Sequence, residues 1–268
     1  MRKVIPILLV YVFFAAGCMT LEGQPYAINI LSTPQEIQLG EKLATEVEKQ
    51  EETLDDAELQ AYVTAIGERL ERVATRQDVP YRFTVIDNPD TVNAFALPGG
   101  PMYLYTGLLK MCENEAELAS VMAHEMAHVA AHHHGEALTK QYGYSLLMQA
   151  LLGEDPGTLA KMASDLLGAG VLSYYSRTNE READALGMEF LFRAGYRPEA
   201  MVSFMQKLMA EEQRAGGGHP LPIFSSHPPT QERFLRLQNL LQKYPPAARQ
   251  ESPVYEERYQ EKALSRLK

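Results

Sequence analysis

The sequence predicts a mostly helical α+β fold with a small antiparallel β-sheet beside a central helix. Short alternating segments between residues 81 and 105 are typical of strands, and the segments around them place apolar residues at helical spacing. The strands come before most of the helices instead of alternating with them, which favours α+β over α/β. With 268 residues, of which 46% are hydrophobic, the chain can bury one good core or two small ones.

The beginning of the chain has the pattern of a targeting segment. A basic start is followed by the apolar residues 4–14 and by Ala-Ala-Gly-Cys18. The small residues before Cys18 resemble the lipobox of bacterial lipoproteins, in which cleavage precedes the cysteine and the thiol is acylated. We therefore expect residues 1–17 to be a signal peptide, Cys18 to be the lipidation site and residues 18–33 to be a linker. An uncleaved anchor and an ordinary secretory signal are the alternatives.

The residue after the cysteine bears on localisation. Met19 stands there, and no Asp is present to signal retention in the inner membrane. Resemblance to sorted lipoproteins therefore favours the bacterial cell envelope, with the protein facing the periplasm and anchored by lipid to the outer membrane.

Residues 34–245 are expected to form one domain, and residues 246–268 a C-terminal tail. The expected elements of its first part are a helix at 34–50, a helix at 58–73, a strand at 81–86 and a hairpin made by 93–97 and 102–105. The expected helices of its second part are 115–138, 141–152, 158–175, one beginning at 180, 198–214 and 230–243.

The segment at 115–138 contains an H-E-x-x-H motif. His124 and His128 are four residues apart, so they share one helix face and can bind a single ion, while Glu125 can reach a water on that ion and serve as general base. The alternative is a pair of surface histidines flanking a solvated glutamate. The surrounding residues are Ala, Val and Met, and burying these polar groups without a partner would be costly. The motif therefore indicates a zinc site that hydrolyses peptide bonds, and residues 132–134 are interpreted as favourable charge at the helix end.

A catalytic zinc needs a third protein ligand and an open position for water. Glu180 is the candidate, because Asp184 follows it by one helical turn and would reach the far nitrogen of a ligand histidine. The alternative is that Glu180 is an acidic residue favoured by the helix dipole after an Asn179 cap.

Five stretches together carry a resemblance to a known family. They are Asn93-Ala-Phe-Ala-Leu-Pro-Gly-Gly100, Thr106-Gly-Leu-Leu109, the helix with His124 to His128, Tyr174-Tyr-Ser-Arg177 leading into Glu180-x-x-Ala-Asp184, and Ser225-Ser-His-Pro-Pro-Thr230 with Arg233. With these motifs the chain resembles an M48-type metallopeptidase, a gluzincin of the soluble bacterial lipoprotein-type branch. The resemblance covers about residues 35–245.

The resemblance implies a zincin-like fold and one Zn²⁺ per chain. It assigns His124, His128 and Glu180 as zinc ligands, Glu125 as the catalytic base and Asp184 as the group that orients a ligand histidine. It also places His227 and Arg233 near the zinc as catalytic residues.

His227 has two possible roles there. It could donate to the oxyanion, or it could occupy the open zinc position and hold the enzyme off. A loop histidine without a role is the alternative.

Asn93, Ala94 and Phe95 are expected at the sheet edge beside the cleft, where they would bind substrate as an added strand. The alternative is that Phe95 belongs to the core and Asn93 to a turn.

Charge and cysteine content exclude several classes of protein. The net charge of −10, without a basic patch, argues against nucleic-acid binding. If Cys18 is acylated, Cys112 is alone, which excludes a disulfide framework or a zinc-thiolate site.

These observations predict a zinc endopeptidase of the bacterial envelope. Its expected partners are polypeptide substrates and the membrane through a lipid anchor, and the family resemblance suggests unfolded or misassembled envelope proteins as substrates. The alternatives are a chaperone or assembly lipoprotein with a self-blocked, rarely cleaving zinc site, and a purely structural zinc protein. The presence of Glu125 argues against the last, because a closed structural site needs no base.

Overall fold

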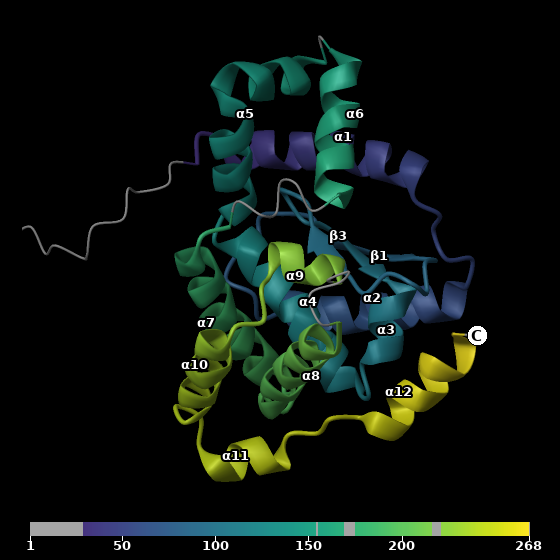
Figure 1. Cartoon of the computed structure of the whole chain (residues 1–268), viewed down its shortest axis with the longest axis vertical. Helices are drawn as coiled ribbons and strands as arrows, with labels where there is room; N and C mark the ends of the chain where they lie inside the picture. The colour runs from purple at the N-terminus through teal and green to yellow at the C-terminus, as the bar shows by residue number, and fades with distance from the viewer. Residues whose placement is uncertain (1–28, 154, 169–174, 216–220, 268) are drawn as a thin grey trace, which may run out of the picture.

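The computed structural model describes residues 29–153, 155–168, 175–215 and 221–267 (Figure 1). The first elements are α1 (Thr33–Gln50), α2 (Ala57–Glu71), β1 (Arg82–Ile86), β2 (Ala94–Ala96), β3 (Pro101–Tyr105), α3 (Thr106–Met111) and α4 (Glu115–Ala130). The later ones are α5 (His133–Leu152), α6 (Pro156–Leu167), α7 (Arg177–Arg193), α8 (Glu199–Ala215), α9 (Pro222–Ser226), α10 (Gln231–Leu241), α11 (Pro246–Glu251), α12 (Glu256–Lys262) and the 3₁₀ turn Leu264–Arg266. The predicted class, a mostly helical α+β fold, is confirmed.

The small sheet has the strand order β1-β3-β2. The expected hairpin is present, since β2 pairs with β3 in antiparallel fashion, and its turn uses Gly99 and Gly100 at φ 76° and 121°, a region that favours glycine. The expectation of a wholly antiparallel sheet was wrong, because β1 pairs with β3 in parallel. Strand β3 lies in the middle of the sheet, with β1 parallel to it on one side and β2 antiparallel to it on the other.

One edge of the sheet is closed by neighbouring groups. The side-chain amide of Gln60 donates to the Phe83 carbonyl at 2.6 Å and accepts from the Val85 N–H at 3.0 Å, as an added strand would. The Leu54 N–H donates to the Val85 carbonyl at 2.9 Å. The outer side of β1 is covered in this way, and β2 forms the opposite edge of the sheet.

Helix α4 lies at the centre of the molecule and is buried from Glu115 to Val129. It packs against α7, α8 and β2. The predicted helix over 115–138 is interrupted: α4 ends at Ala130, His132 has a left-handed φ of 59°, and α5 begins at the next residue. The Arg76 guanidinium donates to the Val129 carbonyl at 2.9 Å and so provides a hydrogen-bond donor for a carbonyl group in the last turn of the helix.

Helices α5 and α6 form a pair that stands above the sheet in Figure 1. Gly143 has φ 70° and ψ 172°, which bends α5 inside the helix expected at 141–152, a few residues after the break that was expected at 139–140. The buried faces of α5 and α6 share an apolar cluster with α1 and with aromatic residues of β2 and β3. The expected helix at 158–175 is present up to Leu167, and residues 169–174 lie outside the described residues.

The C-terminal segment follows the lower edge of the view in Figure 1 and packs on the same core as α4. Tyr259 is fully buried, and its hydroxyl donates to the Leu109 carbonyl at 2.7 Å. Arg258 is bonded to Glu115, the first residue of α4. Residues 246–267, expected to be a tail, thus help to hold the N-terminal end of the central helix.

The expected signal peptide, Cys18 and most of the linker lie outside the described residues. Within the described ranges, no helix has both the length and the apolar character needed to cross a membrane. Cys112 is buried with a free thiol, as expected of a small hydrophobic core residue.

Candidate metal centre

The tightly packed helices α4 and α7 supply His124, His128 and Glu180, three of the four residues at the centre. Asn114 caps α4 by accepting the Glu117 N–H at 3.0 Å. Ser176 and Asn179 form a capping box at the start of α7, so Glu180 lies inside the helix, one turn from its cap. Gly187 lets the two helices approach closely, because a Cβ there would lie 3.1 Å from the backbone of His124.

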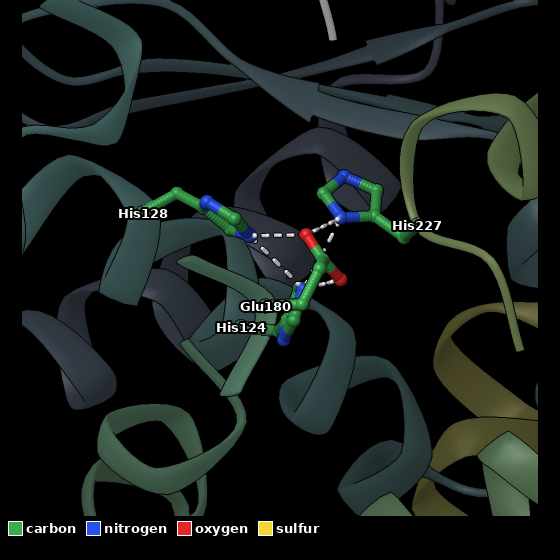
Figure 2. A group of neighbouring side chains, drawn as sticks. All are labelled: His124, His128, Glu180 and His227. Carbon is green, nitrogen blue, oxygen red and sulfur yellow. Dashed lines mark hydrogen bonds and ion pairs between the residues drawn. The ribbon is translucent and has the colours of Figure 1, made fainter. Parts of the chain in front are cut away.

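Four side chains converge on one point: His124 and His128 of α4, Glu180 of α7 and His227 directly after α9 (Figure 2). The Nε2 atoms of the two α4 histidines are 3.2 Å apart. The Glu180 Oε1 lies 3.2 Å from His128 Nε2 and 3.0 Å from His227 Nδ1. All four residues are buried, and their facing atoms lie within 4.8 Å of one another.

This donor set fits a zinc ion. Zinc binds imidazole nitrogen and carboxylate oxygen at about 2.0–2.2 Å, and a tetrahedron of that size has edges of about 3.3–3.6 Å. The separations between neighbouring donor atoms here run from 3.0 to 3.6 Å. Imidazole and carboxylate are also the ligands that zinc prefers among the groups available at this place. His124, His128 and Glu180 could hold the ion, with His227 at the fourth corner.

Asp184 and Arg233 support the cluster from behind. The Asp184 Oδ1 lies 3.2 Å from His124 Nδ1, the nitrogen that faces away from the centre. Arg233 donates through Nε and Nη2 to both oxygens of Asp184, at 3.0 and 2.7 Å. A third nitrogen of Arg233 lies 2.8 Å from Glu180 Oε2. Arg233 therefore links Asp184, the carboxylate next to His124, to Glu180.

The charges of these groups follow from burial and pairing. Burial opposes the charged form of His124, but its bonds to Asp184 and Glu180 outweigh burial and raise its pKa to about 9. Burial holds the pKa of His128 well below its ordinary value. Burial would raise the pKa of Glu180, yet His227 and Arg233 hold it well below normal. The centre thus keeps an ionised carboxylate beside one imidazole that favours its neutral form.

Glu125 lies next to the cluster without joining it. Its Oε1 is 3.3 Å from His227 Nε2, and its Oε2 is buried without a hydrogen-bond partner among the described groups. Burial raises the pKa of this carboxyl, while the positive charge that His227 and His124 can carry works against that rise. A carboxylate with one free oxygen and a raised pKa is suited to accept a proton.

Sequence reasoning did not assign two residues to the centre: Tyr175 was given no role, and His133 was interpreted as favourable charge at a helix end, which is wrong because His133 is buried and burial lowers its pKa. His133 Nδ1 lies 3.0 Å from His128 Nδ1, and the ring of Tyr175 stacks on His128 with centroids 4.3 Å apart. His133 is five residues from His128, so a continuous helix would have placed it on another face. The left-handed turn at His132 returns the His133 side chain to the side of the helix where His128 lies. This turn has no clear signal in the sequence. Tyr175 belongs to the Tyr-Tyr-Ser-Arg stretch, whose position before Glu180 is the signal that could have found it.

The segment expected to bind substrate, Asn93 to Phe95, lies at the start of β2. The Phe95 side chain follows the alternative interpretation, in which it belongs to the core. Phe95 is fully buried and stacks on Tyr103 at 5.2 Å, so its side chain belongs to the core. Asn93 is also buried. Asn93 and Leu97 form main-chain bonds to β3, which leaves the main-chain groups of Ala94 and Ala96 at the outer edge of the sheet. A substrate strand could therefore pair with this edge only through main-chain groups.

Comparisons with known proteins agree with this geometry. Residues 57–241 match the family model described as peptidase family M48. The chain is 32% identical over 222 residues, or 79% of its length, to the beta-barrel assembly-enhancing protease of *Escherichia coli*, and it spans 45% of that relative. It is 33% identical over 182 residues, or 67% of its length, to the mitochondrial metalloendopeptidase OMA1 of *Schizosaccharomyces pombe*, of which it spans 52%. The chain thus spans about half the length of the curated relatives it matches.

Proposed function

This chain belongs to peptidase family M48 and is a metalloprotease, and from that premise we propose that it is a zinc-dependent endopeptidase of the bacterial cell envelope. The proposed substrates are polypeptides that are unfolded or misassembled. The observation that carries the proposal is Glu125, which lies beside a buried cluster of His124, His128 and Glu180 with one carboxylate oxygen free.

The residues have distinct roles in this proposal. His124, His128 and Glu180 would hold one zinc ion, which would supply acidification of a water molecule and polarisation of the scissile carbonyl. Glu125 accepts the proton of the attacking water and then delivers it to the leaving amine. Asp184 accepts the Nδ1–H of His124 and thereby keeps its Nε2 lone pair directed at the ion. Arg233 positions Asp184 and Glu180 without touching the reacting atoms.

Substrate binding is proposed at the outer edge of β2. An extended peptide would add to the sheet by pairing with the main chain of Ala94 and Ala96. Glu125 lies beside the main chain of Ala96, which brings this edge next to the proposed base. Such main-chain recognition needs a locally unfolded segment, because a folded protein offers few free strands of that length.

His227 is proposed to restrain the enzyme at rest. Its Nδ1 is 3.0 Å from Glu180 Oε1 and 3.3 Å from His124 Nε2, so it would compete with the attacking water for the fourth position at an ion held by the other three residues. Its Nε2 simultaneously faces Glu125 at 3.3 Å. Withdrawal of His227 would free both the open position and the base.

The envelope location is proposed from the Ala-Ala-Gly-Cys18 stretch, whose cysteine would carry the lipid anchor. The name of the *E. coli* relative, a beta-barrel assembly-enhancing protease, supports substrates that are envelope proteins. The alternative of a chaperone that rarely cleaves is not favoured, because the matched relatives are named as peptidases.

The test is degradation of casein by the purified protein, with and without a chelator, beside Glu125→Gln. Activity that is lost on chelation, restored by added zinc and absent in Glu125→Gln is expected. Cleavage that persists in the chelated protein would overturn the zinc mechanism.

A further inference from the structure

The two histidines of α4 differ in what lies behind their rings. Each can face an ion with Nε2 only if the other ring nitrogen, Nδ1, carries the proton, because a neutral imidazole has one N–H and one lone pair. Behind Nδ1 of His124 lies the carboxylate of Asp184, at 3.2 Å. Figure 2 shows His128 with one ring nitrogen turned toward Glu180 and the other turned away from it. Behind that second nitrogen lies another imidazole, that of His133.

The His133 ring is placed to accept a hydrogen bond from His128. The Nδ1 atoms of the two rings are 3.0 Å apart. His133 is only 2% exposed, and burial favours the neutral form of an imidazole, in which one nitrogen donates and the other accepts. If Nδ1 of His133 accepts the proton of His128, the proton of His133 itself lies on its Nε2.

A carboxylate lies close to that Nε2 atom. Nε2 of His133 is 3.4 Å from Oε2 of Glu182, a residue of α7. An ionised carboxylate can only accept hydrogen bonds, so Glu182 favours the form of His133 that has its proton on Nε2. That form leaves Nδ1 of His133 free to accept from His128. Because the Glu182 side chain is 54% exposed, this series of contacts runs from the surface to the metal centre.

The turn between α4 and α5 gives His133 its place. His132 has a left-handed φ of 59°, which a residue other than glycine adopts where its surroundings hold it. Its Nδ1 lies 3.1 and 3.2 Å from the two oxygens of Glu36, a buried residue of α1. Glu36 is paired with Arg76 at 2.5 Å, and Arg76 also donates to a carbonyl in the last turn of α4. Contacts from two distant segments therefore fix the turn that directs His133 toward His128.

We propose that His133 is a positioning residue for the metal centre: it accepts the Nδ1–H of His128, donates its own Nε2–H to Glu182 and so keeps the Nε2 lone pair of His128 directed at the ion. This inference rests on the proposed zinc function and adds the support of the second histidine ligand. A neutral ring gives this support without a further buried negative charge at a centre that already holds the carboxylates of Glu180 and Asp184.

The direct test is a nuclear magnetic resonance spectrum of the zinc-loaded wild-type protein with ¹⁵N in its histidine rings. A hydrogen bond from an N–H group to a nitrogen atom couples the two ¹⁵N nuclei. A coupling should therefore join Nδ1 of His128 to Nδ1 of His133. A His128 Nδ1–H group without coupling to His133 would overturn the inference.

Substitutions test whether this contact supports metal binding. His133→Phe keeps a ring and removes the acceptor, so zinc affinity should fall by about 10–100-fold, as is usual when a ligand histidine loses its partner. His133→Asn should recover most of the affinity, because its side-chain oxygen can accept near the place of Nδ1. Competition with a chromogenic chelator measures the affinity, and thermal unfolding of the metal-free proteins measures stability. A merely structural role would lower the metal-free stability and leave the affinity of the folded protein for zinc unchanged.

Glu182 gives a second variant that leaves the buried core unaltered. Glu182→Ala removes the acceptor of the Nε2–H group, so the ¹⁵N shifts of the His133 ring should show both neutral forms, and zinc affinity should fall less than in His133→Phe. Glu189→Ala removes an exposed carboxylate from the same helix and is the matched control, which should change neither. An unaltered His133 ring in Glu182→Ala would overturn the role assigned to Glu182.

The outcomes separate this inference from the proposed function. If wild type binds zinc and His133→Phe folds and binds it equally well, the inference is wrong while the proposed function stands. If His133→Phe does not fold, the coupling in the wild-type protein decides. If zinc binds with the coupling present but nothing is ever cut, the proposed function fails and the positioning role stands. If wild type binds no zinc, both are wrong.

Discussion

The Nδ1 atom of His227 lies 3.0 Å from the Oε1 atom of Glu180, although the two residues belong to different elements and are 47 positions apart. In the proposed function, this contact keeps the imidazole at the corner of the metal centre that a water molecule would need, and so gives His227 a direct way to control the site.

We predict that His227→Ala raises cleavage of unfolded casein, and self-cleavage with it, because the substitution frees the fourth corner and Glu125. If His227 instead stabilised the oxyanion, activity would fall by about two to three orders of magnitude. Rates per bound metal ion distinguish the two outcomes. Lys161→Ala is the control, since Lys161 belongs to an exposed ion pair of α6.

Replacement of Glu125 by Gln should remove activity and retain the metal. The amide cannot accept the proton of the attacking water, so kcat should fall by about 10²–10⁴-fold. Metal content measured by mass spectrometry should stay at one ion per chain. Glu189→Gln, on an exposed ion pair of α7, is the matched control. A metal-loaded Glu125→Gln protein with near-normal cleavage would exclude Glu125 as the base.

Asp184→Asn should weaken metal binding by about 10–100-fold, because His124 loses the carboxylate that accepts its Nδ1–H. It also leaves the buried Arg233 without its two-point partner, and breaking such a pair costs about 3–5 kcal/mol of folding stability. Competition with a chromogenic chelator and thermal unfolding measure the two effects. Asp165→Asn, at a partly exposed carboxylate on α6, should change neither. Unchanged metal affinity in Asp184→Asn would refute its role.

Removal of the metal should lower the melting temperature, and Glu180→Gln should reduce the difference between the loaded and metal-free forms. A ligand at 100 times its dissociation constant stabilises the native state by about 2.7 kcal/mol. The change should be seen in thermal unfolding with and without chelator. If Glu180→Gln kept the full metal-dependent shift, another residue would have to be the third ligand.

Cys18→Ala should release the protein from the membrane fraction. Acylation of the Cys18 thiol is the anchor that the motif predicts. Cell fractionation and the mass of the mature amino terminus provide the measurement, with Cys112→Ala as the control because Cys112 is a buried core residue. A mature protein carrying an unmodified Cys18 would rule out the anchor.

Local patterns were sufficient to predict most of the elements. Helix α2 and strand β1 follow from apolar spacing, and the turn of the β2-β3 hairpin follows from Pro-Gly-Gly-Pro. The parallel pairing of β1 with β3 did not follow, because register between distant strands depends on packing that no local pattern contains. The end of α4 was missed for a similar reason: Arg76, far away in the chain, satisfies its last carbonyl groups.

By itself the sequence determined the chemistry of the centre, since the spacing in His124-Glu-x-x-His128 and Glu180-x-x-x-Asp184 places reactive groups on single helix faces regardless of the rest of the fold. Only the tertiary structure decided what surrounds them. It brought His133 and Tyr175 against His128, fastened Arg233 to Asp184 and turned Phe95 into the core. The physical reason is that helical periodicity acts over a few residues, whereas burial and pairing of groups from separate helices arise only when the whole core is packed.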